Sequence, residues 1–106
     1  MKVWQILYTN RALTDLETVY EYIAFVLQEP QKAQRQVNAI MDAIDQLDHM
    51  PFRYRLYPVE PWASRGLRVL TILNYLVFYL PDEQNSTIAI IRILYGGRDI
   101  ASELNR

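Results

Sequence analysis

The sequence has 106 residues, of which 51% are hydrophobic and 22% charged, and it contains no cysteine. This length predicts one domain, residues 1–106, with the composition of an ordinary globular protein that buries a modest core. The lack of cysteine excludes disulfides and thiolate metal sites and fits a reducing cytoplasm. Since no apolar stretch approaches the ~20 residues of a membrane span, we expect a cytoplasmic protein without membrane contact.

The charged residues are divided unequally along the chain. Residues 1–49 carry four Lys/Arg and seven Asp/Glu, a net charge of −3, whereas residues 50–106 carry seven Arg, no Lys and five Asp/Glu, a net charge of +2. Arginine suits planar, bidentate contact with phosphate or carboxylate. Most single arginines are nevertheless ordinary solvated side chains, and the total net charge of −1 does not indicate a polyanion partner.

The first half of the chain predicts a strand followed by two helices. Residues 2–8 are rich in β-forming residues, which predicts the strand, and Thr9 or Asn10 can cap the helix that follows. Glu29-Pro30 ends this helix, and Pro30 suits the first turn of the next. Each helix has one apolar stripe at spacings of three and four: Leu13, Leu16, Tyr20, Ile23 and Leu27, then Ala33, Val37, Ile40, Ile44 and Leu47. So tight a connection predicts an antiparallel helical hairpin.

Residues 50–66 contain three prolines, and so we expect them to form no regular element. Arginine and tyrosine alternate here, at Arg53, Tyr54, Arg55 and Tyr57. In a nucleic-acid-binding protein, such aromatics stack on bases while arginines hold phosphate. We favour the simpler interpretation, a long loop anchored over the core by its aromatic residues.

The last part of the chain predicts three strands, at residues 67–72, 75–80 and 87–95, that form an antiparallel meander. The middle strand is apolar enough to be covered on both faces. Strict alternation places Arg92 on one face with Ile88, Ile90 and Leu94, either at the strand edge or pointing into a cleft. Gly96-Gly97 supplies a turn with positive φ, and a short helix follows. The fold class is α+β, β-α-α-β-β-β(-α), with the helical hairpin on one sheet face and the other face open to a partner or substrate.

This order of elements, with ALTDL at 12–16, Tyr20-x-Tyr22-Ile23, GLR at 66–68, NYLVFYLP at 74–81 and IRILYGGRDI at 91–100, resembles the RelE/ParE superfamily of bacterial toxins. The resemblance covers essentially the whole chain. It implies the toxin of a type II toxin–antitoxin module, a cognate antitoxin that neutralises it, and operator DNA contacted only through that antitoxin. It implies no cofactor and no metal.

The superfamily contains two activities. RelE-type toxins cut mRNA on the ribosome, and metal-free cleavage needs cations at the phosphate and an acid–base group. Arg68 and Arg98 fall on basic positions of that pattern, but Leu76 replaces an arginine and Leu104 replaces the catalytic tyrosine. ParE-type toxins inhibit DNA gyrase without cleaving RNA, and residues 75–81 resemble their third strand. We therefore favour gyrase inhibition. A RelE-like mRNA endoribonuclease, or an inactive member that only binds an antitoxin, stays open.

Two groups of residues are candidates for binding. The predicted basic, target-binding surface consists of Arg65, Arg68, Arg92 and Arg98, with Arg68 and Arg98 as the catalytic candidates if the protein is a ribonuclease. The predicted antitoxin groove contains Leu16, Tyr20, Tyr75, Tyr79 and Tyr95. The exposed sheet face and this groove together suggest that the antitoxin binds through an extended segment plus an amphipathic helix.

Other polar residues have simpler interpretations. We expect Arg98 to lie close to Arg68, and Asp99 either to pair with Arg98 or to cap the last helix. His49 suits the end of the second helix rather than catalysis. Asp42, Asp45 and Asp48 form a solvated helix face rather than a metal site.

Overall fold

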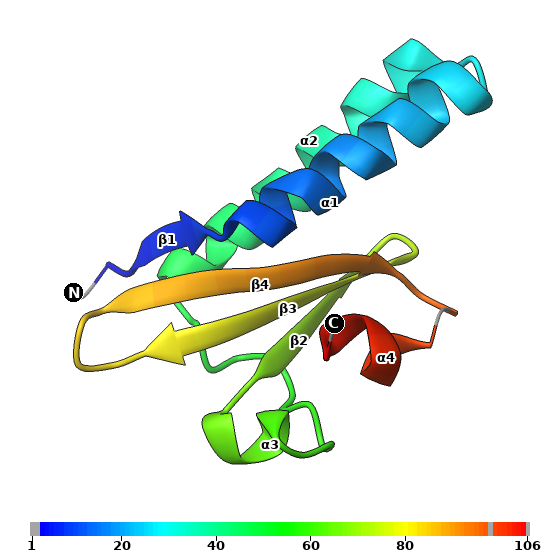
Figure 1. Cartoon of the computed structure of the whole chain (residues 1–106). Helices are drawn as coiled ribbons and strands as arrows, with labels where there is room; N and C mark the ends of the chain where they lie inside the picture. Colours follow the sequence, from blue (N-terminus) through cyan, green and yellow to red (C-terminus); the bar gives the residue numbers. More distant parts are fainter. Residues whose placement is uncertain (1–2, 98, 106) are drawn as a thin grey trace.

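The computed structural model describes residues 3–97 and 99–105. Figure 1 shows its elements in chain order: β1 (Gln5–Tyr8), α1 (Asn10–Glu21) continued by a π-helical turn (Tyr22–Val26), α2 (Pro30–Asp45) continued by a 3₁₀ turn (Gln46–Asp48), α3 (Trp62–Arg65), β2 (Arg68–Ile72), β3 (Tyr75–Asp82), β4 (Thr87–Tyr95) and α4 (Ile100–Leu104). In the described part of the chain, no helix is long and apolar enough to cross a membrane.

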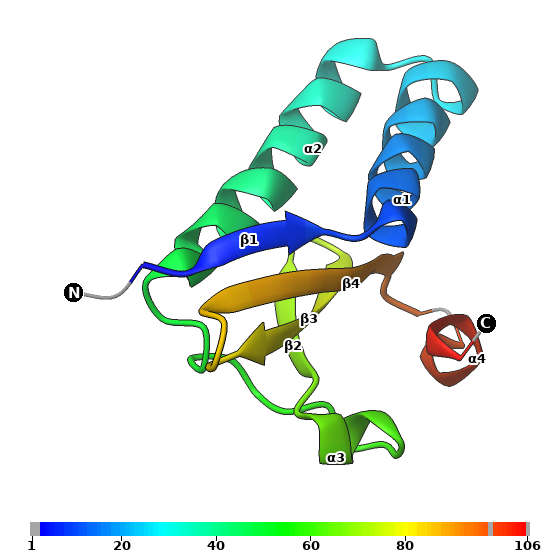
Figure 2. The same ribbon diagram turned by 60° about the vertical axis from the view of Figure 1, so that its left-hand side comes forward.

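The strands form one twisted sheet in the order β1-β4-β3-β2. β2, β3 and β4 are antiparallel neighbours, as the meander predicts, and β1 pairs with β4 in parallel. Helices α1 and α2 run side by side as an antiparallel hairpin across one face of this sheet (Figures 1 and 2). The α+β fold class predicted from the sequence is confirmed, and the parallel pairing of β1 is the addition that the sequence does not reveal.

The start of α1 ties the helix to the sheet. Thr9 is the N-cap, since its hydroxyl oxygen accepts a hydrogen bond from the Ala12 N–H at 3.2 Å, and the same hydroxyl donates to the Ile90 carbonyl of β4 at 2.7 Å. Pro30 occupies the first turn of α2, as expected. These local signals place the hairpin directly over β4.

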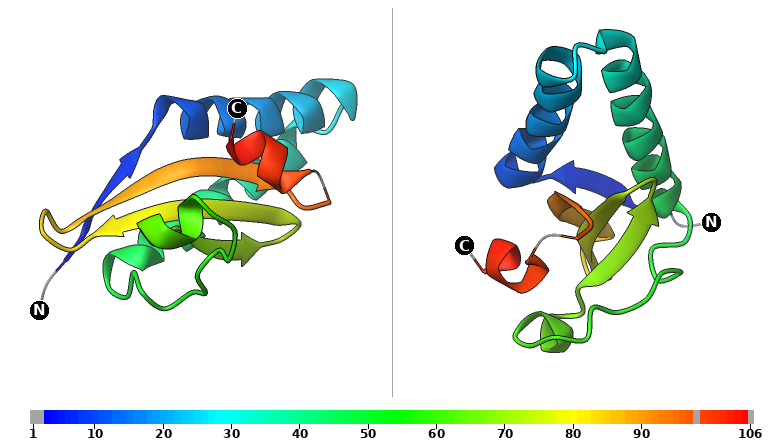
Figure 3. Two further views of the ribbon diagram at one scale, coloured as in Figure 1. Left: turned by 60° about the horizontal axis from the view of Figure 1, so that its bottom comes forward. Right: turned by 90° about the vertical axis from the view of Figure 1, so that its right-hand side faces the viewer.

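The core lies on both faces of the sheet. Under the hairpin, residues such as Leu16, Ile40 and Ile44 pack against Tyr79 and Ile90. The opposite face carries a second buried cluster, which consists of Leu67, Val69, Phe78, Leu94 and Leu104. The later part of the loop, with Tyr57, and the two short helices α3 and α4 lie over this face (Figure 3). The prediction that this face is open is therefore wrong, because α4 folds back and buries Leu104 against it.

A β-bulge explains why strict alternation fails in β4. The register between β3 and β4 shifts at Phe78/Tyr79, so that Tyr79 pairs with Ile90 while Phe78 pairs with Arg92. The residue of β4 between Ile90 and Arg92 therefore has no partner in β3, and the side chains after it point to the face opposite the one that strict alternation predicts. Arg92 thus shares a face with Leu94, as expected, but not with Ile90 or Ile88, which belong to the cluster under the hairpin.

The loop of residues 50–66 is anchored by its aromatic and proline residues, as favoured from the sequence. The Tyr79 hydroxyl donates to the Pro51 carbonyl at 2.9 Å, and Tyr57 meets Phe78 edge-on with 5.4 Å between ring centroids. Buried hydrogen bonds and edge-to-face rings of this kind fix a loop against a core.

The expectation that this loop holds no regular element is wrong at α3. The Glu60 carboxylate accepts hydrogen bonds from the Ser64 N–H and hydroxyl, at 2.8 and 2.6 Å, and these bonds lower the pKa of Glu60. Gly66 ends the turn with a φ of +84°. The short helix places Trp62 and Arg65 beside the end of α4.

Candidate functional site

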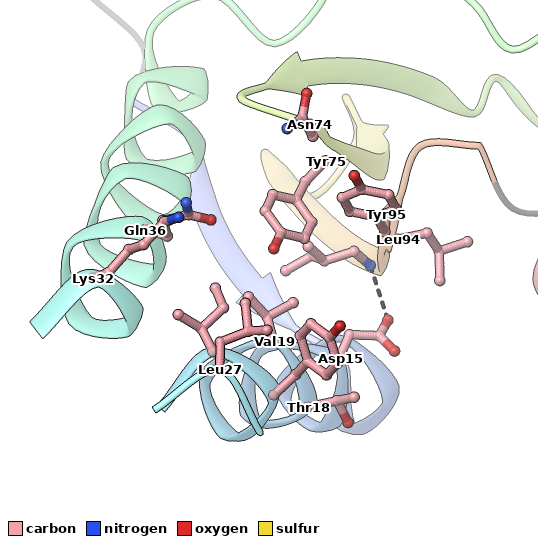
Figure 4. A pocket seen from close by; sticks show the side chains of 13 residues that line it. Asp15, Thr18, Val19, Leu27, Lys32, Gln36, Asn74, Tyr75, Leu94 and Tyr95 are labelled. Carbon is pink, nitrogen blue, oxygen red and sulfur yellow. Dashed lines mark hydrogen bonds between the residues drawn. The ribbon is translucent and has the colours of Figure 1, made fainter. Parts of the chain in front are cut away.

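A groove lies between the helical hairpin and the adjoining ends of β3 and β4, with a cavity volume of about 650 Å³. Figure 4 shows Val19 and Leu27 on the hairpin side, Tyr75 and Tyr95 on the sheet side, and Lys32 on α2. The complete lining is Asp15, Thr18, Val19, Tyr22, Ile23, Leu27, Lys32, Gln36, Asn74, Tyr75, Ile93, Leu94 and Tyr95. Its walls are mainly apolar, with polar groups at the rim.

The structure divides the candidate antitoxin residues. Tyr75 and Tyr95 line the groove and meet edge-on at 5.6 Å between ring centroids; Tyr95 is half exposed, and burial raises the pKa of Tyr75. Leu16 and Tyr79 lie in the core under the hairpin, and Tyr20 packs against a small cluster between α1 and α2. Leu16 and Tyr79 therefore present no groove surface.

The hairpin contributes groove residues that the sequence shows only as members of its apolar stripe. Ile23 and Leu27 line the groove, and the π-helical turn beside them exposes 70% of Phe25 and 66% of Val26. A π-helical turn in an α-helix commonly marks a functional site. Lys32 and Asn74 at the rim carried no sequence signal that distinguishes them from other surface residues.

Arg92 is 7% exposed and is held by an ion-pair network. Its Nε and Nη2 donate to the two oxygens of the Asp15 carboxylate at 2.8 and 2.9 Å, and its Nη1 donates to the Glu103 carbonyl at 2.8 Å. The bonds to Asp15 raise the pKa of Arg92. Because its guanidinium is bound in this way, Arg92 joins α1, β4 and α4.

Arg68 is half-buried and holds the long loop. Its Nη1 donates to the carbonyls of Phe52 at 3.1 Å and Tyr54 at 2.6 Å, and its guanidinium lies over the Phe52 ring. The charge is thus directed at the protein's own backbone. Arg65, by contrast, is exposed, and its guanidinium lies 5.2 Å from the centre of the Trp62 ring.

The glycine turn ends β4 as expected. Gly97 has a φ of +98°, and the Gly96 N–H donates to the Asn74 carbonyl at 2.8 Å. Asp99 caps α4 by accepting from the Ser102 hydroxyl at 2.9 Å and from its N–H at 3.4 Å. Arg98 lies outside the described residues.

The expected neighbourhood of Arg98 and Arg68 is therefore not described. The residues before Arg98 are described. β2 and β4 lie on either side of β3 and run in the same direction; Arg68 is at the start of β2, whereas Gly96 follows the end of β4 and lies beside Asn74.

Leu104 and His49 stand at the two positions that the sequence singles out for possible acid–base chemistry. Leu104 is 5% exposed and packs with Leu67 and Phe78. His49 pairs with its neighbour Asp48 at the end of the 3₁₀ turn. Within residues 3–97 and 99–105, no group of three or more His, Asp or Glu side chains could hold a metal ion.

Comparison with known proteins agrees with this geometry. Residues 6–100 match the model of a family described as the ParE toxin of the type II toxin–antitoxin system, parDE. The fold is similar to a chain from a chromosomal ParDE system of Pseudomonas aeruginosa (25% identity, TM-score 0.72, 88% of this chain and 96% of that chain).

Two more distant structures share the fold. They are a chain of a RelBE toxin–antitoxin complex from Mycobacterium tuberculosis (19% identity, TM-score 0.66, 88% of this chain and 98% of that chain) and a mutant of the Escherichia coli toxin RelE in the free state (10% identity, TM-score 0.66, 97% and 90%). No curated protein matches the sequence significantly.

Proposed function

Because the chain belongs to the ParE toxin family of type II toxin–antitoxin systems, we propose that it arrests growth by inhibiting DNA gyrase and is neutralised by a cognate antitoxin. It does so by binding, without cleaving RNA. The antitoxin alone contacts operator DNA, which agrees with a toxin whose net charge is −1.

The burial of Leu104 is the observation that supports binding rather than catalysis. Metal-free RNA cleavage needs a group that moves a proton at the reacting oxygens and cations that stabilise the phosphate. Leu104 stands at the position of the catalytic tyrosine in the RelE-like pattern, offers no ionisable group and is packed into the core. Arg68, the described catalytic candidate, is directed at the carbonyls of Phe52 and Tyr54.

The groove supports a helical segment of the antitoxin as its occupant. The groove is lined by apolar side chains, and the hairpin turn that supplies Ile23 and Leu27 also exposes Phe25 and Val26; exposed apolar surface of this kind marks an interaction site. An amphipathic helix buries one apolar face in such a groove. Lys32 at the rim would meet an acidic residue on the antitoxin helix.

Two assays on purified protein test the target. In the first, gyrase supercoils relaxed plasmid in the presence of increasing toxin; in the second, translating ribosomes carry a labelled mRNA. We expect loss of supercoiling and intact mRNA. Cleaved mRNA with unaffected supercoiling would support the RelE-like ribonuclease instead, and inactivity in both assays would support a member that only binds its antitoxin.

A groove variant tests the antitoxin site separately. For this assay we expect the adjacent open reading frame to encode the antitoxin. Tyr95→Ala removes an exposed groove aromatic, and we expect weaker antitoxin binding with unchanged inhibition of gyrase. Met41→Ala is the matched control, since Met41 is an exposed apolar residue of α2 outside the groove. Equal antitoxin affinity for both variants and the wild type would place the antitoxin elsewhere.

A further inference from the structure

A second concave surface, the basic cleft, lies between the start of α1, β4 and the short helices α3 and α4, with a volume of about 410 Å³. Its apolar part is formed by Trp62 of α3, Ile91 of β4 and Leu104 of α4. Arg11 and Arg65 are exposed at its rim. It shares no lining residue with the groove, and neither Asp nor Glu lines it among the described residues.

Two contacts fix the orientation of Trp62 and Arg65 at the basic cleft. The Trp62 indole N–H donates to the Asn105 side-chain oxygen at 3.1 Å, which fixes the ring against the end of α4. Arg65 lies over this ring, and in the described part of the chain no carboxylate forms an ion pair with it. A guanidinium stacked on an aromatic ring loses little further freedom when it binds, and its planar edge remains available for bidentate contact.

The buried arginine of this cleft does not set its charge. Arg92 lines the wall, but the Asp15 and Glu103 carboxylates on its other side balance it. The positive charge that a ligand meets therefore comes from the rim. A suitable ligand has a carboxylate or phosphate for Arg65 and an apolar group for the surface formed by Trp62 and Ile91.

A protein segment fits this chemistry better than a nucleic acid does. Nucleic-acid surfaces carry many cations and usually make a domain basic, whereas this chain has an isoelectric point of about 5.7 and no lysine after residue 49. Tryptophan and arginine around a small apolar pocket are the residues that dominate affinity at protein–protein interfaces. The ligand class is thus an acidic side chain flanked by apolar ones.

We propose that the basic cleft binds an acidic, partly apolar segment of the toxin's target protein, with Arg65 as the carboxylate contact and Trp62 as its platform. This inference rests on the proposed function, since it takes gyrase as the target protein. The groove and the cleft share no lining residue, so that the antitoxin helix in the groove and the target segment in the cleft use different residues.

The test compares two arginines of the same loop. Arg65→Gln removes the charge at the cleft. Arg53→Gln is the matched control, because Arg53 is also exposed and also lies over an aromatic ring, Tyr54, but does not line the cleft. We expect Arg65→Gln to weaken gyrase inhibition by about tenfold, the loss of one charged hydrogen-bonding contact, and Arg53→Gln to change it by less than about twofold. Both variants should keep the thermal melting transition of the wild type.

A direct binding assay uses a probe of defined chemistry. Short acetylated peptides of alternating aspartate and leucine, or of asparagine and leucine, are titrated into the wild type, with oligothymidylate as the nucleic-acid probe. Trp62 is a local reporter, since the other tryptophan, Trp4, is buried in the core. We expect only the acidic peptide to shift the Trp62 indole N–H resonance, and Arg65→Gln to abolish the shift.

The outcomes separate the two proposals. Acidic-peptide binding that depends on Arg65, without gyrase inhibition by the wild type, would overturn the proposed function and support the chemistry of the cleft. Full gyrase inhibition by Arg65→Gln, equal losses in both arginine variants, or Arg65-dependent binding of oligothymidylate in place of the peptide would each overturn the cleft proposal.

Discussion

Asp15 is a polar residue whose loss should strongly destabilise the described structure. Its carboxylate accepts two hydrogen bonds from Arg92. It accepts a third, at 2.9 Å, from the Ile93 N–H, which is the dashed line at Asp15 in Figure 4. That N–H lies on the part of β4 beyond its pairing with β1, which ends at Ile90. Asp15 thus pairs a buried guanidinium and also satisfies a backbone group at an open strand edge.

The expected cost follows from these contacts. Only 13% of the Asp15 side chain and 9% of the Arg92 side chain are exposed, so water can replace few of the hydrogen bonds that the substitution removes. Breaking a buried ion pair by changing one partner costs about 3–5 kcal/mol. Arg92 keeps its bond to the Glu103 carbonyl, and the amide oxygen that Asp15→Asn introduces can still accept one bond, so we expect about 3 kcal/mol, the lower end of that range. The total free energy of unfolding of a domain of this size is about 5–15 kcal/mol.

Urea unfolding followed by circular dichroism measures this difference. Asp15→Asn should lower the free energy of unfolding by about 3 kcal/mol and the melting temperature by roughly 10–15 °C. Glu17→Gln is the control: it makes the same chemical change on the same helix at an exposed position, and it should stay within about 0.5 kcal/mol of the wild type. If the two variants were equally stable, the network around Arg92 would contribute nothing and the reasoning would be refuted.

Three further predictions concern tyrosines and glycines. Tyr79→Phe should lower the free energy of unfolding by about 1 kcal/mol, because it removes the hydrogen bond to Pro51. Tyr8→Phe should leave that free energy unchanged or raise it by up to about 1 kcal/mol, because the buried Tyr8 hydroxyl has no hydrogen-bond partner among the described residues. Chemical unfolding of both variants measures the difference, and equal losses would contradict the prediction. Burial raises the pKa values of Tyr8 and Tyr79 to about 12. Since unfolded tyrosine ionises near pH ~10, their contribution to stability should be complete below that pH and disappear between pH ~10 and ~12; phenolate absorbance should show a late-titrating class, and a single transition near pH ~10 would disprove it. Gly97→Ala should cost about 1 kcal/mol because of the positive φ of Gly97, while Gly96→Ala, which meets only the Asn74 carbonyl at 3.4 Å, should cost less than about 0.5 kcal/mol; melting temperatures in the reverse order would contradict the assignment of the turn.

The elements that local sequence determines could be predicted well. The spacing of Leu16, Ile23 and Leu27 fixes a helix, and Thr9 and Pro30 mark where the two helices begin, because a cap or a proline acts within one turn of its own position. The meander follows in the same way from three apolar segments with short turns. The parallel pairing of β1 with β4 joins segments at opposite ends of the chain, and no local pattern encodes such a contact.

The candidate site was harder to predict because two non-local features redirect its residues. The bulge at Phe78/Tyr79 changes the face to which Arg92 points, and it depends on the register with the neighbouring strand. The return of α4 depends on Leu104 finding space beside Phe78. A run of arginines in the sequence therefore indicates the chemistry that is available, but burial decides which charge faces a partner: Arg65 remains exposed, while Arg68 and Arg92 bind groups of the protein itself.

The network around Asp15 also keeps the two proposed sites chemically different. Asp15 lines the groove, yet both of its oxygens already accept hydrogen bonds from Arg92 and Ile93. A basic residue of the antitoxin gains little from a carboxylate that is already neutralised by a buried guanidinium. The charge that the groove can offer is that of Lys32, whose side chain is 44% exposed and lies 3.9 Å from the exposed Glu29, a surface pair of little energetic weight. Exchanging this charge, in Lys32→Glu, should therefore weaken the antitoxin complex and leave gyrase inhibition unchanged, because the basic cleft, which shares no residue with the groove, takes its charge from Arg65.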